Sequence, residues 1–258
     1  MISNRKNSLD PPKIEGWIWS PFLSHTIKSL SRFNPKEYPV DRQFLDKNVY
    51  IGPQRNPFLA RLSTWACQTK KIRNVRAACL EAGKNASVLN LLISPSKYFE
   101  LPFFGADFVT LPTGYLLALD LQPILRDDSL HTEHVWSKLQ PIHDHWQSLL
   151  PAGGPLPIEA EKYFSPGLLW TRFPLGNKSI ELIDNIIMPA YCDYLSLYLE
   201  LLEESIPVSS SRSEILFEGQ KSYMNYRYEN DPARGMLIRF YGQSWSELYL
   251  RNILFDIS

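Results

Sequence analysis

The sequence is short of the features that mark several large classes of protein. It has only three cysteines in 258 residues, Cys67, Cys79 and Cys192, and no two of them form a C-x-x-C pair. An odd number of cysteines without a motif argues against a disulfide framework and a cysteine-rich metal site, and it favours a reducing compartment. The longest apolar runs, such as residues 87–93 and 115–121, have the length of a strand and are too short to span a membrane.

Signature motifs of common enzyme classes are also missing. There is no G-x-G-x-x-G, no Walker loop and no G-x-S-x-G, so nucleotide, flavin and serine-hydrolase chemistry lack their usual signals. Five histidines are present, and two of them, His131 and His134, are three residues apart. No cysteine or carboxylate set of the kind that binds zinc accompanies them. We therefore expect solvated histidines and no metal site.

The net charge is zero, but the charges are unevenly distributed along the chain. Residues 1–84 contain 15 Lys and Arg against 6 Asp and Glu, whereas the remainder contains 12 against 21. Four of the basic residues, Lys70, Lys71, Arg73 and Arg76, lie close together in the sequence. A basic surface of this kind would attract an acidic partner. A solvated strand edge followed by acidic helices would explain the same composition.

The hydrophobic patterns predict an α+β fold. Between residues 61 and 124, stretches of β-compatible residues alternate with short turns, which predicts consecutive antiparallel strands. In the second half, apolar residues recur at helical spacing, which predicts helices over residues 133–150, 193–204, 231–242 and 245–255. The result is a sheet with helices packed on its faces.

The length of the chain is enough for one sizeable core, and we expect a single domain over residues 14–258. Residues 1–13 are polar and contain two adjacent prolines, so they lack the apolar core of a secretory signal and predict a flexible lead-in. The serine-rich residues 209–213 predict a loop.

Asp107 is the first candidate for chemistry. It lies in residues 103–110, a predicted strand otherwise made of Phe, Gly, Ala, Val and Thr. A carboxylate there must be paired, hydrogen-bonded or neutralised by a raised pKa, and a raised pKa suits a proton donor near neutral pH. A structural aspartate bonded to a backbone amide is the alternative. If the following turn has two or four residues, alternation places Asp120 and Gln122 on the same face as Asp107.

Four further polar residues stand out from their surroundings. Asn90 interrupts an apolar strand, where its amide could tie down a neighbouring strand. Asp231 precedes a proline at a predicted helix start, an ordinary capping arrangement. Arg234, one turn later, could bind a carboxylate with both nitrogens or be a surface cation. Arg172 is a cation among apolar residues, which suits either a buried anion partner or a stem whose charged end reaches water.

Several short motifs follow one another in a specific order. They are LPFFGAD at residues 101–107, LDLQP at 119–123, DPARGM at 231–236, FYG at 240–242, WSE at 245–247 and LF at 254–255. In this order and spacing they resemble the ferredoxin-dependent bilin reductases, and the resemblance covers nearly the whole chain. It implies a three-layer α/β/α sandwich with a central antiparallel sheet, and a bilin held between the sheet and the C-terminal helices.

The resemblance also implies a chemistry. No cofactor is bound; reduced [2Fe-2S] ferredoxin delivers electrons singly, bilin radicals form, and the protein supplies protons. The family's strand aspartate corresponds to Asp107, and the second aspartate, found in the branch that reduces the A-ring, corresponds to Asp231. We expect these two residues to be the catalytic proton donors. The residues expected to bind the substrate are Asn90, Asp120, Arg172 and Arg234. Of these, Arg234 would hold a propionate or orient Asp231.

Departures from one branch of the family favour another. The phycocyanobilin-forming branch has a histidine in place of Asn90, and a glutamate upstream where this strand offers small or basic residues. The motifs WAC at 65–67, YFSPG at 163–167 and WTR at 170–172 extend the match to the branch that reduces the A-ring diene of 15,16-dihydrobiliverdin to phycoerythrobilin. The alternatives are 15,16-reduction or phytochromobilin-type A-ring reduction of biliverdin, a non-catalytic bilin carrier, and a small adaptor that docks through the basic N-terminal face.

The resemblance finally suggests partners and a compartment. We expect a monomer that meets its bilin substrate, ferredoxin and the bilin reductase acting before it, with no nucleic-acid or membrane partner. The expected location is the cyanobacterial cytoplasm or the plastid stroma.

Overall fold

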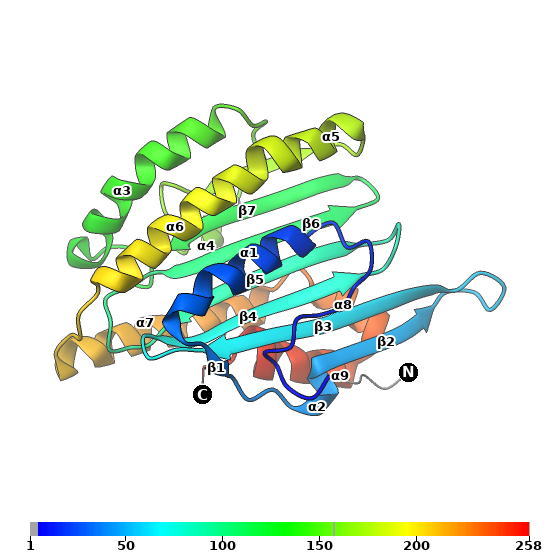
Figure 1. Ribbon diagram of the computed structural model, residues 1–258, viewed down its shortest axis with the longest axis horizontal. Coiled ribbons are helices and arrows are strands. Elements are labelled where there is room, and N and C mark those ends of the chain that lie inside the picture. The colour runs from blue at the N-terminus through cyan, green and yellow to red at the C-terminus, as the bar shows by residue number, and fades with distance from the viewer. Residues whose placement is uncertain (1–4, 157, 258) are drawn as a thin grey trace.

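One antiparallel sheet forms the centre of the molecule (Figure 1). The computed structural model describes residues 5–156 and 158–257. Its eight strands are β1 (Lys36–Glu37), β2 (Asp46–Ile51), β3 (Phe58–Gln68), β4 (Ile72–Glu81), β5 (Ser87–Pro95), β6 (Phe103–Leu111), β7 (Gly114–Gln122) and β8 (Leu169–Phe173). From β3 to β7 each strand pairs with the next, β8 follows at one edge, and β1 and β2 both pair with β3. The predicted antiparallel succession is confirmed.

Helices cover both faces of the sheet, as Figure 1 shows. One layer contains α1 (Ser20–Leu30), α3 (Ser129–Gln147), α5 (Asn177–Leu182) and α6 (Met188–Glu204). The other contains α7 (Ser210–Asn230), α8 (Arg234–Tyr241) and α9 (Gln243–Tyr249). Short helical segments complete the fold: α2 (Arg42–Leu45), α4 (Ile158–Glu161), a 3₁₀ turn (Ser31–Phe33) and two π-helical turns (Ile183–Ile187 and Leu250–Leu254). The expected α/β/α sandwich is confirmed.

The two faces of the sheet have separate hydrophobic cores, because successive side chains of a strand point to opposite sides. In β6, Phe104, Ala106 and Phe108 join the core beneath α1 and α6. Phe103, the residue before Phe104, points to the other face and joins the core beneath α7, α8 and α9. Each core is therefore built from alternate residues of the same strands.

The predicted helices are present, but the sequence did not predict where α7 begins. The segments expected at 133–150 and 193–204 lie within or beside α3 and α6, and Gly242 follows the last residue of α8 as predicted. Residues 209–213 are not a loop: the hydroxyl of Ser209 accepts a hydrogen bond from the Arg212 backbone N–H at 3.2 Å and caps α7. A serine at this place starts a helix because it satisfies one of the free N–H groups of the first turn.

The segment expected as a flexible lead-in is packed against the sheet where the structure describes it, from residue 5 onward. The backbone of Ser8 is paired with that of Ala66 at 3.1 Å, and Ser8 is fully buried. The indole N–H of Trp65 donates to the carbonyl of Leu9 at 3.1 Å. Leu9 also packs against the hydrophobic core, and Arg5 donates to the carboxylate of Asp46 at 3.1 Å, so backbone and side chains both hold this segment.

No helix in the described ranges combines the length and the apolar character that crossing a membrane requires.

Gly114 allows the hairpin between β6 and β7 to lie close to β8, and this gives a test of the fold. Its φ is +138°, and a Cβ added there would lie 2.5 Å from the carbonyl oxygen of Phe173. We expect Gly114→Ala to lower the free energy of unfolding by about 3–5 kcal/mol, from backbone strain together with the clash. Gly83, with φ +58° and nothing within 4 Å, is the matched control. Gly83→Ala should lose only about 1–2 kcal/mol in the same denaturant titration, and equal losses would contradict the argument.

Candidate active site

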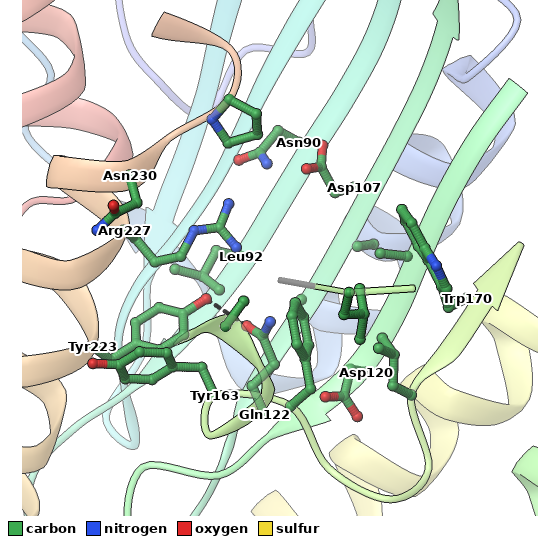
Figure 2. A pocket seen from close by; sticks show the side chains of 18 of the residues that line it. Asn90, Leu92, Asp107, Asp120, Gln122, Tyr163, Trp170, Tyr223, Arg227 and Asn230 are labelled. Atoms are coloured by element: carbon green, nitrogen blue, oxygen red, sulfur yellow. Dashed lines mark hydrogen bonds between the residues drawn. The ribbon is translucent and has the colours of Figure 1, made fainter. Parts of the chain in front are cut away.

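A cavity of about 310 Å³ lies between the sheet and α7 (Figure 2). Strands β4 to β7 form its floor, and α7 with Phe255 forms one wall. Residues from the segment between α3 and β8, including Tyr163, Phe164 and Leu168, complete the lining, and the ring of Tyr163 stacks on Tyr226 of α7. Much of the lining is apolar or aromatic, and a few charged side chains face the space. Such a combination suits a largely apolar ligand that carries a few polar groups.

The hairpin between β6 and β7 brings the predicted polar residues onto this floor. Only two residues, 112 and 113, connect the strands, and Asp107 pairs with Ala118 while Gly105 pairs with Asp120. Asp107, Asp120 and Gln122 therefore share one face and line the cavity. This outcome satisfies the condition on the turn length that the sequence analysis stated.

Gln122 reaches across the floor because Gly105 has no side chain. A Cβ on Gly105 would lie 2.8 Å from Oε1 of Gln122. That oxygen accepts a hydrogen bond from the hydroxyl of Tyr223 on α7 at 2.5 Å, which Figure 2 shows as a dashed line. The bond joins the floor of the cavity to its helical wall.

Asn90 is the cross-strand partner of Asp107, and the two side chains lie next to each other in Figure 2. Its side-chain oxygen accepts a hydrogen bond from Arg76, whose Nη1 also donates to the Asn90 carbonyl at 3.2 Å. The Nε of Arg76 donates to the carbonyl of Leu254 at 2.9 Å. Burial lowers the pKa of Arg76 to about 10, so the guanidinium remains charged near neutral pH. Because Arg76 engages the oxygen of Asn90, the amide nitrogen is the atom left to donate within the cavity.

Asp231 lies in the turn between α7 and α8, beside the cavity. Its neighbours Asn230 and Pro232 line the space, while its own side chain is 4% exposed. One carboxylate oxygen accepts the Ala233 backbone N–H at 2.7 Å, so the capping role predicted from sequence is present. Burial raises the pKa of Asp231; the cation of Arg227 opposes this rise, and the negative charge of Asp107 adds to it. The two predicted proton donors thus influence each other electrostatically.

Asp120 has a different environment on the same floor. It is fully buried, and it accepts hydrogen bonds from both the backbone N–H of Ser165, at 2.8 Å, and the Ser165 hydroxyl. Burial raises the pKa of Asp120 to about 7 in spite of these bonds. Its carboxylate therefore anchors the wall segment that contains Tyr163, and it lies at the edge of the space predicted for the substrate.

The two arginines predicted to bind substrate lie in different places. Arg172 is exposed at the rim of the cavity, with its guanidinium 4.9 Å from the centre of the Trp170 ring. Arg234 does not line the cavity. Its guanidinium instead bonds to the carboxylate of Glu247 and to the carbonyl of Tyr228. The structure therefore places only Arg172 where a substrate carboxylate could reach it.

Two cations that line the cavity, Arg76 and Arg227, were not predicted as site residues from the sequence. Arg76 is buried, and Arg227 is half-buried. Arg227 precedes Asp231 by four residues, about one helical turn, but Asp231 lies just beyond the end of α7. The spacing therefore suggests that the two are neighbours and does not show which way either side chain points.

His131 corrects a second expectation. It is buried and not solvated: its Nδ1 lies 2.7 Å from Glu100, and its Nε2 accepts the backbone N–H of Ile124 at 3.0 Å. Its role is to join the start of α3 to two loops. Within the described residues, no group of three or more His, Cys, Asp or Glu side chains could hold a metal ion.

Comparisons with known proteins agree on one family. The model of the ferredoxin-dependent bilin reductases matches residues 24–256. The chain belongs to this family. It is 56% identical to the phycoerythrobilin:ferredoxin oxidoreductase of Prochlorococcus marinus strain MIT 9211, over the whole of both chains. It is 54% identical to the enzyme of the same name from Parasynechococcus marenigrum strain WH8102, over 99% of this chain and 98% of that one.

A solved structure shows the same fold. The phytochromobilin synthase of tomato, solved in complex with biliverdin, has a TM-score of 0.82 over 93% of this chain and 83% of the other, at 24% identity. As a bilin reductase, the chain is an oxidoreductase that depends on ferredoxin as its electron donor.

The environment of Asp120 predicts a specific pH dependence of stability. Its pKa is about 7 in the folded protein and near 3.8 in the unfolded chain, so the folded protein binds the additional proton between these values. The free energy of unfolding should therefore fall as pH rises from about 4 to 7, by up to about 4 kcal/mol from this group alone. Denaturant titrations across this range should show a smaller fall for Asp120→Asn.

The test compares how the free energy of unfolding changes with pH. If Asp120→Asn weakens the bonds to Ser165, stability falls equally at every pH, and the slope is unaffected. Asp184→Asn, on an exposed residue of the opposite layer, serves as the control and should keep the parental slope. Parallel curves for the parent and Asp120→Asn would contradict the assignment.

Proposed function

We propose that this enzyme reduces the A-ring diene of 15,16-dihydrobiliverdin to phycoerythrobilin. Two electrons arrive one at a time from a [2Fe-2S] ferredoxin, bilin radicals form between them, and the protein supplies two protons. Support comes from the shared name of full-length relatives at 51–56% identity, which the sequence motifs match. We further propose that the enzyme acts as a monomer in the cyanobacterial cytoplasm, where the bilin reductase that precedes it supplies the substrate.

The observation that carries the proposal is that Asp107 lines the cavity and Asp231 is buried beside it, next to the lining residues Asn230 and Pro232. Asp107 lies on the sheet floor and Asp231 lies in the turn that follows α7, so a flat ligand between sheet and helix would have one on each side. A raised pKa keeps Asp231 protonated at higher pH than an exposed aspartate would be. We assign both residues as proton donors, and Asn90 as the donor that positions the substrate beside Asp107.

The cavity also suits the polar ends of a bilin. Its propionates carry negative charge and are strongly hydrated, so they favour the rim, where Arg172 is exposed. The conjugated rings are largely apolar and suit the aromatic walls. Arg234 has a different role in this proposal, because its pairing with Glu247 holds the turn that contains Asp231.

The reaction is tested by an anaerobic assay of the purified protein with reduced ferredoxin and 15,16-dihydrobiliverdin, followed by absorption spectroscopy and chromatography. We expect conversion to phycoerythrobilin, and no reduction when biliverdin is offered instead. Reduction of biliverdin would assign the enzyme to another branch of the family. Tight binding of 15,16-dihydrobiliverdin without turnover would instead indicate a carrier.

The two proton donors are tested by Asp107→Asn and Asp231→Asn. Each variant keeps the shape of the side chain and loses its proton, so we expect bilin binding with turnover reduced by about 100-fold or more. Bound-state absorption and single-turnover rates separate the two effects. Asp184→Asn, in the opposite layer, should react at the parental rate. Parental turnover in either site variant would remove that residue from the mechanism.

A further inference from the structure

Gln122 is a buried residue of the cavity floor that has one hydrogen-bonding group left over. It lines the cavity and is only 4% exposed. Its side-chain oxygen accepts the bond from the Tyr223 hydroxyl at 2.5 Å. Its amide nitrogen has no acceptor among residues 5–156 and 158–257. Figure 2 shows this nitrogen turned away from Tyr223 and into the space.

Two features of the fold hold the amide in this orientation. Gly105 leaves room for it, since a Cβ on Gly105 would lie 2.8 Å from Oε1 and 3.5 Å from Nε2 of Gln122. The ring of Tyr223 stacks on Phe103, with the ring centres 4.5 Å apart, so the hydroxyl that binds the oxygen is itself held in place. Because the oxygen is engaged, the N–H groups are the part of the amide that a ligand meets.

A second buried glutamine near the cavity is arranged differently. Gln220, one turn before Tyr223 on α7, is 1% exposed and does not line the cavity. Its amide nitrogen donates to the carbonyl of Pro95 at 3.1 Å. The protein therefore supplies an acceptor to Gln220 and supplies none to Gln122. A ligand that fills the cavity would expel water from the nitrogen of Gln122, and leaving this donor unpaired would be unfavourable.

The chemistry of a bilin limits which of its atoms suits this donor. A bilin carries two kinds of oxygen, the carboxylates of its propionates and the lactam carbonyls of its terminal rings. The amide of Gln122 lies over Gly105, whose cross-strand partner is Asp120, deep on the floor. A propionate placed there would lose its hydration next to another carboxyl group, whereas Arg172 offers it a cation at the rim. A neutral lactam carbonyl is the better match.

The register of the sheet indicates which of the two terminal rings this is. Asn90, the donor assigned to the ring that is reduced, pairs with Asp107. The amide of Gln122 lies over Gly105, two residues away along β6. Two residues of a strand span about 7 Å. The two amides therefore match two different carbonyls, one on each terminal ring.

We propose that Gln122 positions the substrate by donating to the lactam carbonyl of the terminal ring that is not reduced. This inference rests on the proposed function. Tyr223 acts through Gln122, because its hydroxyl keeps the amide nitrogen facing the ligand. In 15,16-dihydrobiliverdin the saturated C15 separates this ring from the conjugated system, so the charge on its carbonyl changes little when an electron arrives. Gln122 therefore strengthens binding and has little effect on the rate of reduction.

The test measures binding of 15,16-dihydrobiliverdin to Gln122→Met and Tyr223→Phe by absorption titration. Gln122→Met keeps the size of the side chain and loses the donor, so its Kd should rise about 10-fold or more. Its single-turnover rate at saturating substrate should change far less. Tyr223→Phe keeps the amide and loses only the bond that orients it, so its Kd should rise less, by about threefold. The propionate dimethyl ester should show the same changes.

The carbonyl itself gives a readout that a purely structural role would not change. A hydrogen bond lowers the C=O stretching frequency, so infrared spectra of bilin labelled with an isotope at this carbonyl should show a higher frequency in Gln122→Met. The double variant should match Gln122→Met alone, because Tyr223 acts through Gln122. Gln220→Met is the matched control: it removes a buried glutamine that bonds to Pro95 and should keep the parental Kd and frequency.

Three results would overturn the inference. The first is a parental Kd in Gln122→Met. The second is an equal rise of Kd in Gln122→Met and Tyr223→Phe with an unmoved carbonyl frequency, because Gln122 would then only join the floor to α7. The third is a rise of Kd that disappears with the dimethyl ester, because it would place a propionate at Gln122. If Gln122→Met does not fold, an unmoved frequency in Tyr223→Phe rejects the inference.

The proposed function fails separately, through the product that the parent forms. If the parent reduces biliverdin instead, the same variants are compared with biliverdin and its dimethyl ester. Both carry the same two lactam carbonyls, so Kd and the carbonyl frequency still decide the role of Gln122.

Discussion

The register of β5, β6 and β7 is the constraint on which the site depends. Asn90 pairs with Asp107, and Asp107 with Ala118, so a polar row crosses three strands on one face. The residues between them, such as Phe104 and Phe108, fill the apolar core on the other face. A slip of one residue would move the carboxylates into that core and the rings into the cavity. Burial of the aromatic residues on one face therefore fixes the polar residues of the site on the other face.

The polar and charged residues around the cavity form two groups, one that holds the structure together and one that is available to a ligand. Arg76 orients Asn90 and holds the end of the chain near Leu254, and Asp120 holds the wall segment through Ser165. These groups are hydrogen-bonded by the protein and need no ligand. Asp107 and Arg227 line the cavity, and Asp231 lies beside it with one oxygen bonded to the Ala233 backbone N–H; in the proposed function, the two aspartates act on the ligand. Buried charge is unfavourable unless it is paired, so the second group is the part of the site that binding would stabilise.

The sequence predicted features that depend on residues close together in the chain, and it did not predict contacts between distant segments. The shared face of Asp107 and Asp120 follows from strand alternation, which is visible in the sequence, and from a two-residue turn, whose length the sequence left open. Arg234 was assigned to the substrate because it lies one turn from Asp231. The residue that pairs with it, Glu247, comes from a different helix, and no spacing rule predicts that contact.

Arg227 shows the opposite case. Residues 210–230 carry polar side chains on most sides, so no apolar stripe indicated which face of the helix meets the sheet. Only the folded structure shows that Tyr223 and Arg227 point inward. Similarly, residues 5–13 contact the sheet through long-range bonds such as those of Ser8 and Leu9 with Ala66 and Trp65, which composition does not reveal.

The balance of forces on Asp231 explains why a cation beside it is compatible with the proposed role of Asp231 as a proton donor. Burial and the charge of Asp107 both raise its pKa, and together they would make the carboxyl group reluctant to ionise. A general acid must retain its proton near neutral pH and still release it to the substrate, which requires a pKa between these extremes. The positive charge of Arg227 opposes this rise and lowers the pKa of Asp231.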